Sequence, residues 1–318
     1  MRRLFTAGLL LTLLAGGVGL TWLRRAANAP GPLPTPSDLV IPREGVAPLS
    51  RDLAALHLVK DPLVFRMAAL LSHGDGNLHA AEFSFPAQAS VAQVLQILRT
   101  AKPVLHKLTI PEGLTAQQIA ILLTNANAAS GPVPPLTEGE LFPDTYKFER
   151  GVSRAALVRM AKAQMDKVLQ EEWQDRVAGL PLATPEQALI LASIVEHETA
   201  LPDERPHVAA VFENRLRAGM KLESDPTVIY GASNGLGELD HPITRAELDA
   251  ATPYNTYVIT GLPPTPIASP GRAAIHAVLH PLASEDLYFV ANGTGGSSFA
   301  PTLSEHKQNV EKWRKLGH

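Results

Sequence analysis

The chain begins with an unbroken apolar run. Residues 4–23 read LFTAGLLLTLLAGGVGLTWL, without a charge, and a pair of arginines flanks the run on each side. At about 1.5 Å per residue, a helix of this length crosses a hydrocarbon core of about 30 Å. A cleaved signal peptide is the alternative, because Ala27-Asn28-Ala29 has the A-x-A spacing, but the run is longer than a usual h-region. We expect residues 1–25 to be an uncleaved transmembrane anchor, with the rest of the chain outside the cytoplasm.

Prolines replace the apolar residues directly after this run. The segment APGPLPTPS, residues 29–37, contains four prolines. Because proline fixes φ and has no backbone N–H, such a segment is stiff and extended. We expect residues 26–38 to be a linker that holds the following domain away from the bilayer.

Short apolar strands alternate with short amphipathic helices from residue 39 to residue 127. Residues 39–42 and 108–111 each read as a strand that ends at a proline and precedes a helical pattern. Ser50 and Thr115 are candidate N-caps, and Thr115 is followed three residues later by glutamine, which is the spacing of a capping box; a further helix is expected over residues 90–98. This pattern predicts a small α+β module over residues 39–127, without a catalytic group.

A second stretch rich in proline and glycine, residues 128–140, indicates a domain boundary. From residue 128 to residue 318 we expect one larger, mostly helical domain. Its clearest helix follows Thr184, where threonine, proline and glutamine occupy the N-cap, N1 and N3 positions. The residues that follow, ALILASIV, are apolar on nearly every side, so this helix is predicted to be buried.

Composition narrows the possible functions. Of the 318 residues, 45% are hydrophobic and 19% are charged, so the chain can bury a core. Its net charge of −3 lacks the basic excess of nucleic-acid-binding proteins. The chain has no cysteine, which excludes disulfides and thiolate chemistry. His197-Glu198 begins an H-E-x-x-H pattern, but position 201 is leucine, and nothing else in the sequence indicates a metal or a cofactor.

Two carboxylates stand at the far end of the predicted buried helix. Glu198 comes one turn after Ile194 and Val195 and shares their apolar face, whereas Glu196 lies about 200° around the helix from Glu198. Apolar surroundings raise the pKa of a carboxyl, so Glu198 could act as a general acid near neutral pH. The alternative is that both glutamates are solvated at the end of the helix.

Polar and aromatic residues are concentrated between residues 214 and 257. Aromatic rings combined with amides and hydroxyls suit sugars, whose rings present both C–H faces and hydroxyl edges. The alternative is a polar hub of loops that only holds the helices together. The candidate substrate-binding residues are Asn214, Ser224, Asp225, Thr227, Tyr230, Tyr254, Asn255, Thr256 and Tyr257.

Taken in order, these stretches resemble the endolytic murein transglycosylases of the MltG (YceG-like) family. The segments that carry the resemblance are FPDTY (142–146), ASIVEHETA (192–200), VFENRL (211–216), GMKLESDPTVIYG (219–231), PYNTY (253–257), GLPPTPI (261–267) and LYFVANGTGG (287–296). The resemblance implies an α+β chain with a transmembrane helix, a small LysM-like module and a larger, mostly helical lytic-transglycosylase-like catalytic domain. One departure is Ser297-Ser298-Phe299, where the family often has histidine before the phenylalanine.

The resemblance also implies an activity and a place in the cell. The family's enzymes are lyases that cut peptidoglycan between N-acetylmuramic acid and N-acetylglucosamine and leave 1,6-anhydromuramyl ends, which terminates the elongation of nascent strands. The family's single catalytic glutamate corresponds to Glu198. Glycan strands and cell-wall synthases (penicillin-binding proteins) are the implied partners. The expected location is the inner membrane, with a single span and the catalytic domain in the periplasm.

Two other functions are compatible with the sequence. The first is a catalytically silent, peptidoglycan-binding scaffold for cell-wall synthases, for which the Ser297 departure leaves room. The second is a hydrolase that uses Asp225 or Glu196 as a second carboxylate, because two-carboxylate glycosidases need a partner about 5–9.5 Å from the acid.

Overall fold

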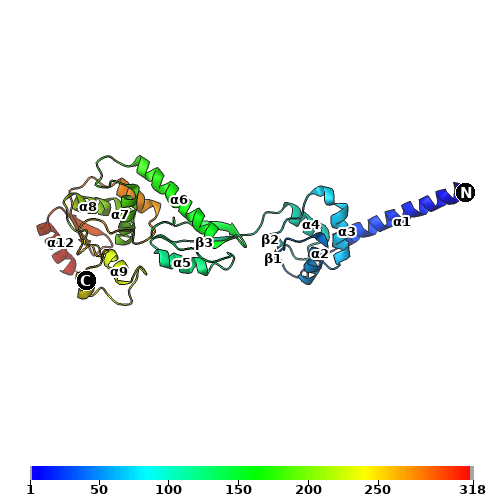
Figure 1. Ribbon diagram of the computed structural model, residues 1–318, viewed down its shortest axis with the longest axis horizontal. Helices are drawn as coiled ribbons and strands as arrows, with labels where there is room; N and C mark the ends of the chain where they lie inside the picture. Colours follow the sequence, from blue (N-terminus) through cyan, green and yellow to red (C-terminus); the bar gives the residue numbers. More distant parts are fainter. Residues whose placement is uncertain (1, 316–318) are drawn as a thin grey trace. The chain divides into compact units, whose positions relative to one another are not determined.

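The computed structural model describes the backbone of residues 2–315 and, in the first helix, the side chains from residue 14 onward. The chain forms two compact units, one of residues 1–106 with 147–151 and one of residues 107–146 with 152–318. Helices dominate the described residues, and strands there form only small two-stranded sheets (Figure 1). The fold is therefore mixed α+β and mostly helical, as predicted.

Helix α1 (Arg2–Asn28) contains the apolar run of the N-terminus. Within the described part of the chain, no helix combines the length and the apolar character needed to cross a membrane. The side chains of the first half of the predicted anchor lie outside the described residues. The anchor at residues 1–25 therefore stays a prediction.

The first unit packs three short helices and one sheet around the end of helix α1. Strand β1 pairs antiparallel with β2, so that Leu39 lies opposite Phe83. The core includes Leu53, Phe65 and Leu98, which are fully buried. Its elements are β1 (Ser37–Val40), α2 (Val46–Ala55), α3 (Pro62–Leu71), the 3-10 turn η1 (His73–Asp75), β2 (Glu82–Phe85) and α4 (Val91–Thr100).

The proline-rich segment is packed against this unit instead of forming a free spacer. Leu33 and Ala27 are buried in the core of the unit. The N–H of Gly31 donates to the carbonyl of Gln88 at 3.0 Å, and a Cβ on Gly31 would lie only 2.1 Å from the carbonyl oxygen of Ala89. This segment packs on the unit because the leucine between its prolines has an apolar site to fill, and its role as a spacer from the bilayer stays a prediction.

The predicted helix starts are confirmed at Ser90 and Thr115, where both residues make complete capping boxes. The prediction for Ser50 was wrong. Helix α2 begins four residues earlier, after Gly45, and the buried Ser50 hydroxyl donates to the carbonyl of Ala47 at 2.8 Å. Leu49 and Leu53 are buried one turn apart on the same face as Ser50, and Pro48 is tolerated in the first turn of a helix, so the helix starts before the serine.

The second unit begins earlier in the sequence than the expected boundary at residue 128. Strand β3 (Leu105–Thr109) pairs with β4 (Thr145–Glu149). Helix α5 (Ala116–Thr124) belongs to the second unit, in which the N–H of Ser269 donates to the carbonyl of Leu114 at 2.8 Å. Residues 107–127 therefore fold with the larger unit, although their local pattern echoes that of the smaller one.

Helix α7 is the centre of the second unit. It packs against α6, α8, α9 and α11, and its residues from Ala188 to Val195 are all buried. Thr184 caps it by accepting from the N–H of Gln187, and Pro185 occupies its first turn, as predicted. The helices of this unit that follow α5 are α6 (Arg154–Asp175), α7 (Pro185–Glu198), α8 (Arg205–Arg217), α9 (Asp225–Ala232), α10 (Arg245–Asp249), α11 (Arg272–Leu279) and α12 (Leu303–Lys315).

A hairpin closes the C-terminal part of the second unit. Strands β5 (Tyr288–Ala291) and β6 (Ser297–Ala300) pair antiparallel, with Phe289 opposite Phe299. Both of these rings pack against the core that surrounds α7, and α12 packs on the two strands. The hairpin therefore belongs to the same core as the helix that ends at Glu198.

Candidate active site

Glu198 is the last residue of the buried helix α7. The next residue, Thr199, is extended, so the helix ends at this carboxyl. Eight consecutive buried residues precede the last turn of the helix and fix it in the core. A carboxyl at the end of such a helix is held by the core of the domain, with little freedom to move.

Burial raises the pKa of the Glu198 carboxyl to about 7. A hydrogen bond from the Ser224 hydroxyl opposes this effect, the negative charge of Asp225 adds to it, and the positive charge of Arg215 weakens it. A carboxyl with this pKa is present in both protonation states near neutral pH, which is what a group that gives and then takes a proton requires. The raised pKa expected from the apolar face of the helix is confirmed.

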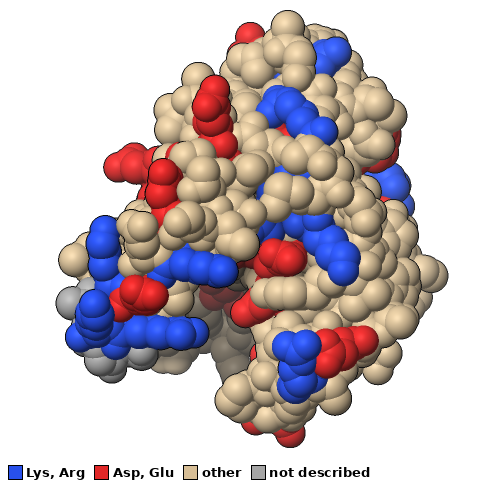
Figure 2. All heavy atoms as spheres, turned by 90° about the vertical axis from the view of Figure 1, so that its left-hand side faces the viewer, with Lys and Arg blue, Asp and Glu red and all other residues tan. Residues whose placement is uncertain are grey.

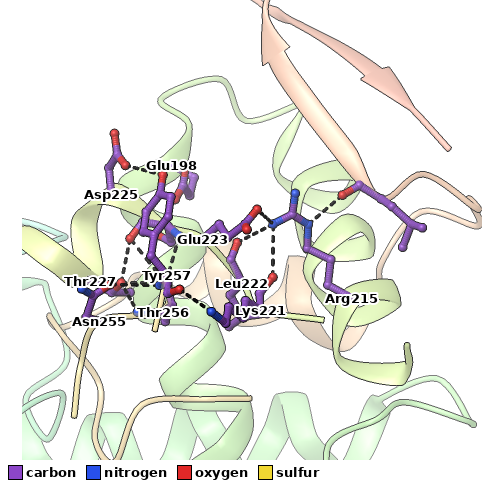
Figure 3. Close-up of polar contacts among 12 residues, drawn as sticks. Glu198, Arg215, Lys221, Leu222, Glu223, Asp225, Thr227, Asn255, Thr256 and Tyr257 are labelled. Atoms are coloured by element: carbon purple, nitrogen blue, oxygen red, sulfur yellow. Dashed lines mark hydrogen bonds and ion pairs between the residues drawn. The ribbon is translucent and has the colours of Figure 1, made fainter. Parts of the chain in front are cut away.

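Ser224 links Glu198 to a buried network of hydroxyl groups. Ser224 stands at the N-cap of α9, but its hydroxyl donates to Glu198 Oε1 and does not cap the helix. The Thr227 hydroxyl donates to the Ser224 carbonyl at 2.7 Å and lies 2.8 Å from that of Thr256, which in turn accepts from the N–H of Ser224 at 2.9 Å. All three hydroxyl residues are buried, so this network fixes the donor that faces Glu198 (Figure 3).

Asp225 and Tyr257 form a second pair beside Glu198. The phenol of Tyr257 donates to Asp225 Oδ1 at 2.6 Å, and Figure 3 shows the two side chains next to Glu198. Burial, followed by the hydrogen bond to Asp225 and then the charge of Asp225, raises the pKa of the Tyr257 phenol, so it stays protonated and remains a donor. The Lys221 ammonium donates to the carbonyl of Tyr257 at 2.8 Å and holds this segment of backbone in place.

Glu196 points to different partners from those of Glu198, as the helix geometry predicts. Its Oε1 accepts from Arg205 at 3.1 Å, and its Oε2 accepts from the N–H of Gly271 at 2.8 Å. A Cβ on Gly271 would lie 1.8 Å from Glu112 Oε1, so a larger residue here would have to displace the Glu112 side chain. Glu196 thus ties the end of α7 to α8 and to the start of α11.

Arg215 is a site residue that the sequence analysis missed. Its guanidinium donates to the carbonyls of Leu287 at 2.7 Å and Leu222 at 2.9 Å, and to Glu223 Oε2 at 3.1 Å. Glu223 has φ of 53°, a left-handed conformation unusual for glutamate, directly before Ser224. The sequence does hold a signal for Arg215, because it is a basic residue among apolar neighbours on α8. A guanidinium buried there needs several hydrogen-bond acceptors, so it is expected to join segments of the chain.

Four of the nine predicted substrate-binding residues have other roles in the structure. The Asn214 amide donates to two backbone carbonyls before β5, and the Asn255 amide donates to three around the end of α10. The rings of Tyr230 and Tyr254 pack edge-on at 4.7 Å, and the Tyr230 hydroxyl donates to Glu138 at 3.0 Å. These contacts match the alternative of a polar hub, whereas Ser224, Asp225, Thr227, Thr256 and Tyr257 lie together beside Glu198.

Glu204, before α8, fixes the glycine-rich turn of the C-terminal hairpin. It accepts from the N–H of Ser297 at 2.7 Å and from its hydroxyl at 3.0 Å. The serine that departs from the family pattern is therefore an anchor point of the hairpin. His306, in α12, stacks on Tyr288 at 5.2 Å.

Acidic and basic side chains are interspersed on the face drawn in Figure 2. This face has no continuous basic surface of the kind that binds a phosphate backbone.

Comparison with known proteins gives consistent matches. The sequence profile of the YceG-like family matches residues 39–312. An endolytic murein transglycosylase of Bacillus subtilis (strain 168) is 35% identical over 181 residues, which are 55% of this chain and 48% of that protein. An endolytic murein transglycosylase of Streptococcus pneumoniae (serotype 2, strain D39) is 30% identical over 303 residues, which are 80% of this chain and 54% of that protein. The chain spans about half the length of these curated relatives.

A solved structure is similar over most of the chain. The crystal structure of a YceG-like protein from Listeria monocytogenes has a TM-score of 0.54 and 27% identity, and the match covers 86% of this chain and 98% of that one. The family profile spans both the small module and the unit that carries Glu198. The chain belongs to the YceG-like family.

Proposed function

We propose that the chain is a lytic transglycosylase that cuts the glycan of peptidoglycan between N-acetylmuramic acid and N-acetylglucosamine. The observation that carries the proposal is Glu198 itself, a single carboxyl with a pKa of about 7 that receives a fixed hydrogen bond from Ser224. The names of the related proteins support the same activity.

In the proposed reaction, Glu198 acts first as an acid and then as a base. The protonated carboxyl gives its proton to the glycosidic oxygen while the bond between this oxygen and C1 of the muramyl residue breaks. The carboxylate then takes the proton of the muramyl C6 hydroxyl, and the freed oxygen attacks C1. The product has a 1,6-anhydro ring, no water is consumed, and Glu198 ends the cycle protonated.

The hydrogen bond from Ser224 suits this cycle because it favours the carboxylate that forms in the middle of it. The Asp225–Tyr257 pair is proposed to line the sugar site, whereas the buried Thr227 and Thr256 hold Ser224 in place behind it. Asp225 is also the carboxylate that a hydrolase would use, since it lies close enough to raise the pKa of Glu198. The two enzymes differ in their product, because the hydrolase would add water at C1 and leave a reducing end.

The cellular setting is part of the proposal. We propose that an anchor at residues 1–25 holds the chain in the inner membrane, with the catalytic domain in the periplasm. There it would end nascent glycan strands beside the cell-wall synthases that make them. The first unit is proposed to be a LysM-like module.

The test is mass spectrometry of the products formed from purified peptidoglycan in heavy-oxygen water. Wild type should release anhydromuramyl ends without heavy oxygen, Glu198→Gln should release at least about 100-fold fewer, and Glu196→Gln is the matched control on the same helix. Reducing ends that carry heavy oxygen would assign the protein to the hydrolases. Binding without any soluble product would favour the scaffold.

A further inference from the structure

Within the second unit, the C-terminal ends of helices α6 and α11 lie next to each other, and neither helix supplies a residue that bonds to Glu198. The N–H of Val177, just after α6, donates to the carbonyl of Leu279 at the end of α11 at 3.1 Å. Glu172 and Asp175 project from the last turn of α6. His276 lies in the last turn of α11, and His280 is its C-cap. Two carboxylates and two imidazoles thus meet where both helices end.

Three of these side chains already have the spacing of metal ligands. One ligand atom each of Glu172, His276 and His280 lies within 4.8 Å of the other two. His276 Nδ1 lies 2.8 Å from Glu172 Oε2, and the two imidazole rings stack at 4.2 Å. The histidines are four residues apart, the spacing of helical zinc motifs, although His280 lies just past the end of α11; their stacked rings place the two imidazoles side by side.

His280 Nε2 is a buried nitrogen without a hydrogen-bond partner among the described residues. The carboxylate oxygen nearest to it in an ion pair is Asp175 Oδ2 at 3.6 Å, which is too long for a hydrogen bond. Two ligands of a tetrahedral zinc ion lie about 3.3 Å apart, because each is about 2.0–2.1 Å from the metal. A metal between these atoms would therefore satisfy the nitrogen with little movement of Asp175, which is mostly exposed and free to adjust.

The local charges also favour a divalent cation. Glu172 and Asp175 carry two negative charges, and the C-termini of two helices add their negative dipole ends at the same place. Helix α6 has no basic residue in its last turn. Arg272 bonds to Oε1 of Glu172 and to Glu171, so it offsets part of the charge of Glu172 but does not contact its Oε2, and Arg176 lies over the ring of Trp173. Glu172 Oε2 is left to face the imidazoles.

We propose that Glu172, Asp175, His276 and His280 bind one transition-metal ion of the zinc class. Two neutral imidazoles with two carboxylates are a ligand set that suits Zn²⁺, Co²⁺ or Ni²⁺ better than Mg²⁺ or Ca²⁺, which prefer oxygen alone. The ion would clasp α6 to α11, which itself packs on α7. The sequence analysis expected no metal because these ligands come from two helices about a hundred residues apart and form no linear pattern.

The test is titration of the full chain, freed of metal with a chelator, with Zn²⁺ by calorimetry and with Co²⁺ by visible absorption. One equivalent of Zn²⁺ should bind, Co²⁺ should give the bands of a tetrahedral site, and Zn²⁺ should raise the melting temperature. His276→Ala and His280→Ala should each weaken binding by about tenfold or more, since even indirect ligand partners cost about 10- to 100-fold. His79→Ala, an exposed histidine of the other unit, is the matched control and should bind as wild type does.

Two results would overturn the proposal. The first is the absence of saturable, one-to-one zinc binding by the wild type. The second is binding of equal strength in wild type and in both histidine variants, with circular dichroism showing that all are folded. The readout is independent of glycan cleavage, so failure of the proposed enzymatic function leaves this test intact.

Discussion

The hydroxyl of Ser224 donates to Glu198 Oε1, although Ser224 stands where a serine would normally cap its own helix. The bond joins the end of α7 to the start of α9. Because it opposes the effect of burial, it keeps the pKa of Glu198 near 7 and prevents a higher value. The balance between burial and this one donor sets the pH range in which Glu198 can exchange a proton.

Ser224→Ala should move the pH profile of cleavage. Removing the donor destabilises the carboxylate, so the pKa of Glu198 should rise above about 7. Glu198 then stays protonated to higher pH, and the basic limb of kcat/KM should move up by about one pH unit, because one hydrogen bond is worth roughly 1 kcal/mol. Ser233→Ala on the same helix is the control, since its hydroxyl bonds to the carbonyl of Tyr230. A basic limb that stays in place or moves down would contradict this account.

Glu198→Gln should make the folded protein more stable at pH 8. The folded-state pKa of Glu198 is raised above the value of about 4.5 expected for the unfolded chain. Between about pH 4.5 and pH 7 the Glu198 carboxyl ionises in the unfolded state but stays protonated in the folded state. Wild type therefore loses stability as pH rises through this window. The variant lacks this cost, and its free energy of unfolding in urea should exceed that of wild type by about 1–3 kcal/mol at pH 8. The difference should vanish near pH 4, and a constant difference across pH would refute the linkage.

Glu196→Gln should destabilise the fold at the end of α7 and have little effect on glycan cleavage. The ion pair with Arg205 is lost, but the amide oxygen can still accept from the N–H of Gly271. Because the amide keeps one of the two contacts, we expect the unfolding free energy to fall by about 1–3 kcal/mol, with kcat/KM within about tenfold of wild type. Glu198→Gln should instead lose roughly 100- to 10,000-fold, the contribution of a general acid–base. Equal losses in the two variants would implicate Glu196 in the reaction.

Arg215→Lys should destabilise the second unit despite keeping the charge. The guanidinium contacts backbone on both sides of the site at once, and an ammonium cannot reproduce this fork. Leaving these buried carbonyls without donors should cost about 2–4 kcal/mol in urea unfolding. Arg245→Lys is the control, because its ion pair with Asp249 is exposed and should be worth less than about 1 kcal/mol. No difference between the two variants would show that Arg215 does not hold this segment.

Features that depend on local geometry could be predicted from the sequence. The helix of residues 185–198, its cap at Thr184 and the divergence of Glu196 from Glu198 all follow from one helical repeat. The raised pKa of Glu198 follows from the apolar residues one turn before it. None of these needs knowledge of a distant contact.

Features that depend on distant partners could not be predicted. Whether an amide such as Asn214 or Asn255 faces a ligand or a backbone carbonyl depends on residues many positions away or on the fold of a loop. The same holds for Arg215, whose acceptors include a strand about seventy residues later. Helix α5 has the local pattern of the first unit, and only its contacts assign it to the second.

Leu23 and Ala27 of helix α1 are buried in the core of the first unit, so the helix is rigidly joined to this unit. The segment after the helix is pinned as well, by the contact of Gly31 under Ala89. Helix α1 and the first unit must therefore move together as one rigid body. In a membrane-anchored chain, a change in helix tilt, caused by bilayer thickness or by a neighbouring helix, would be transmitted as a rotation of the whole unit.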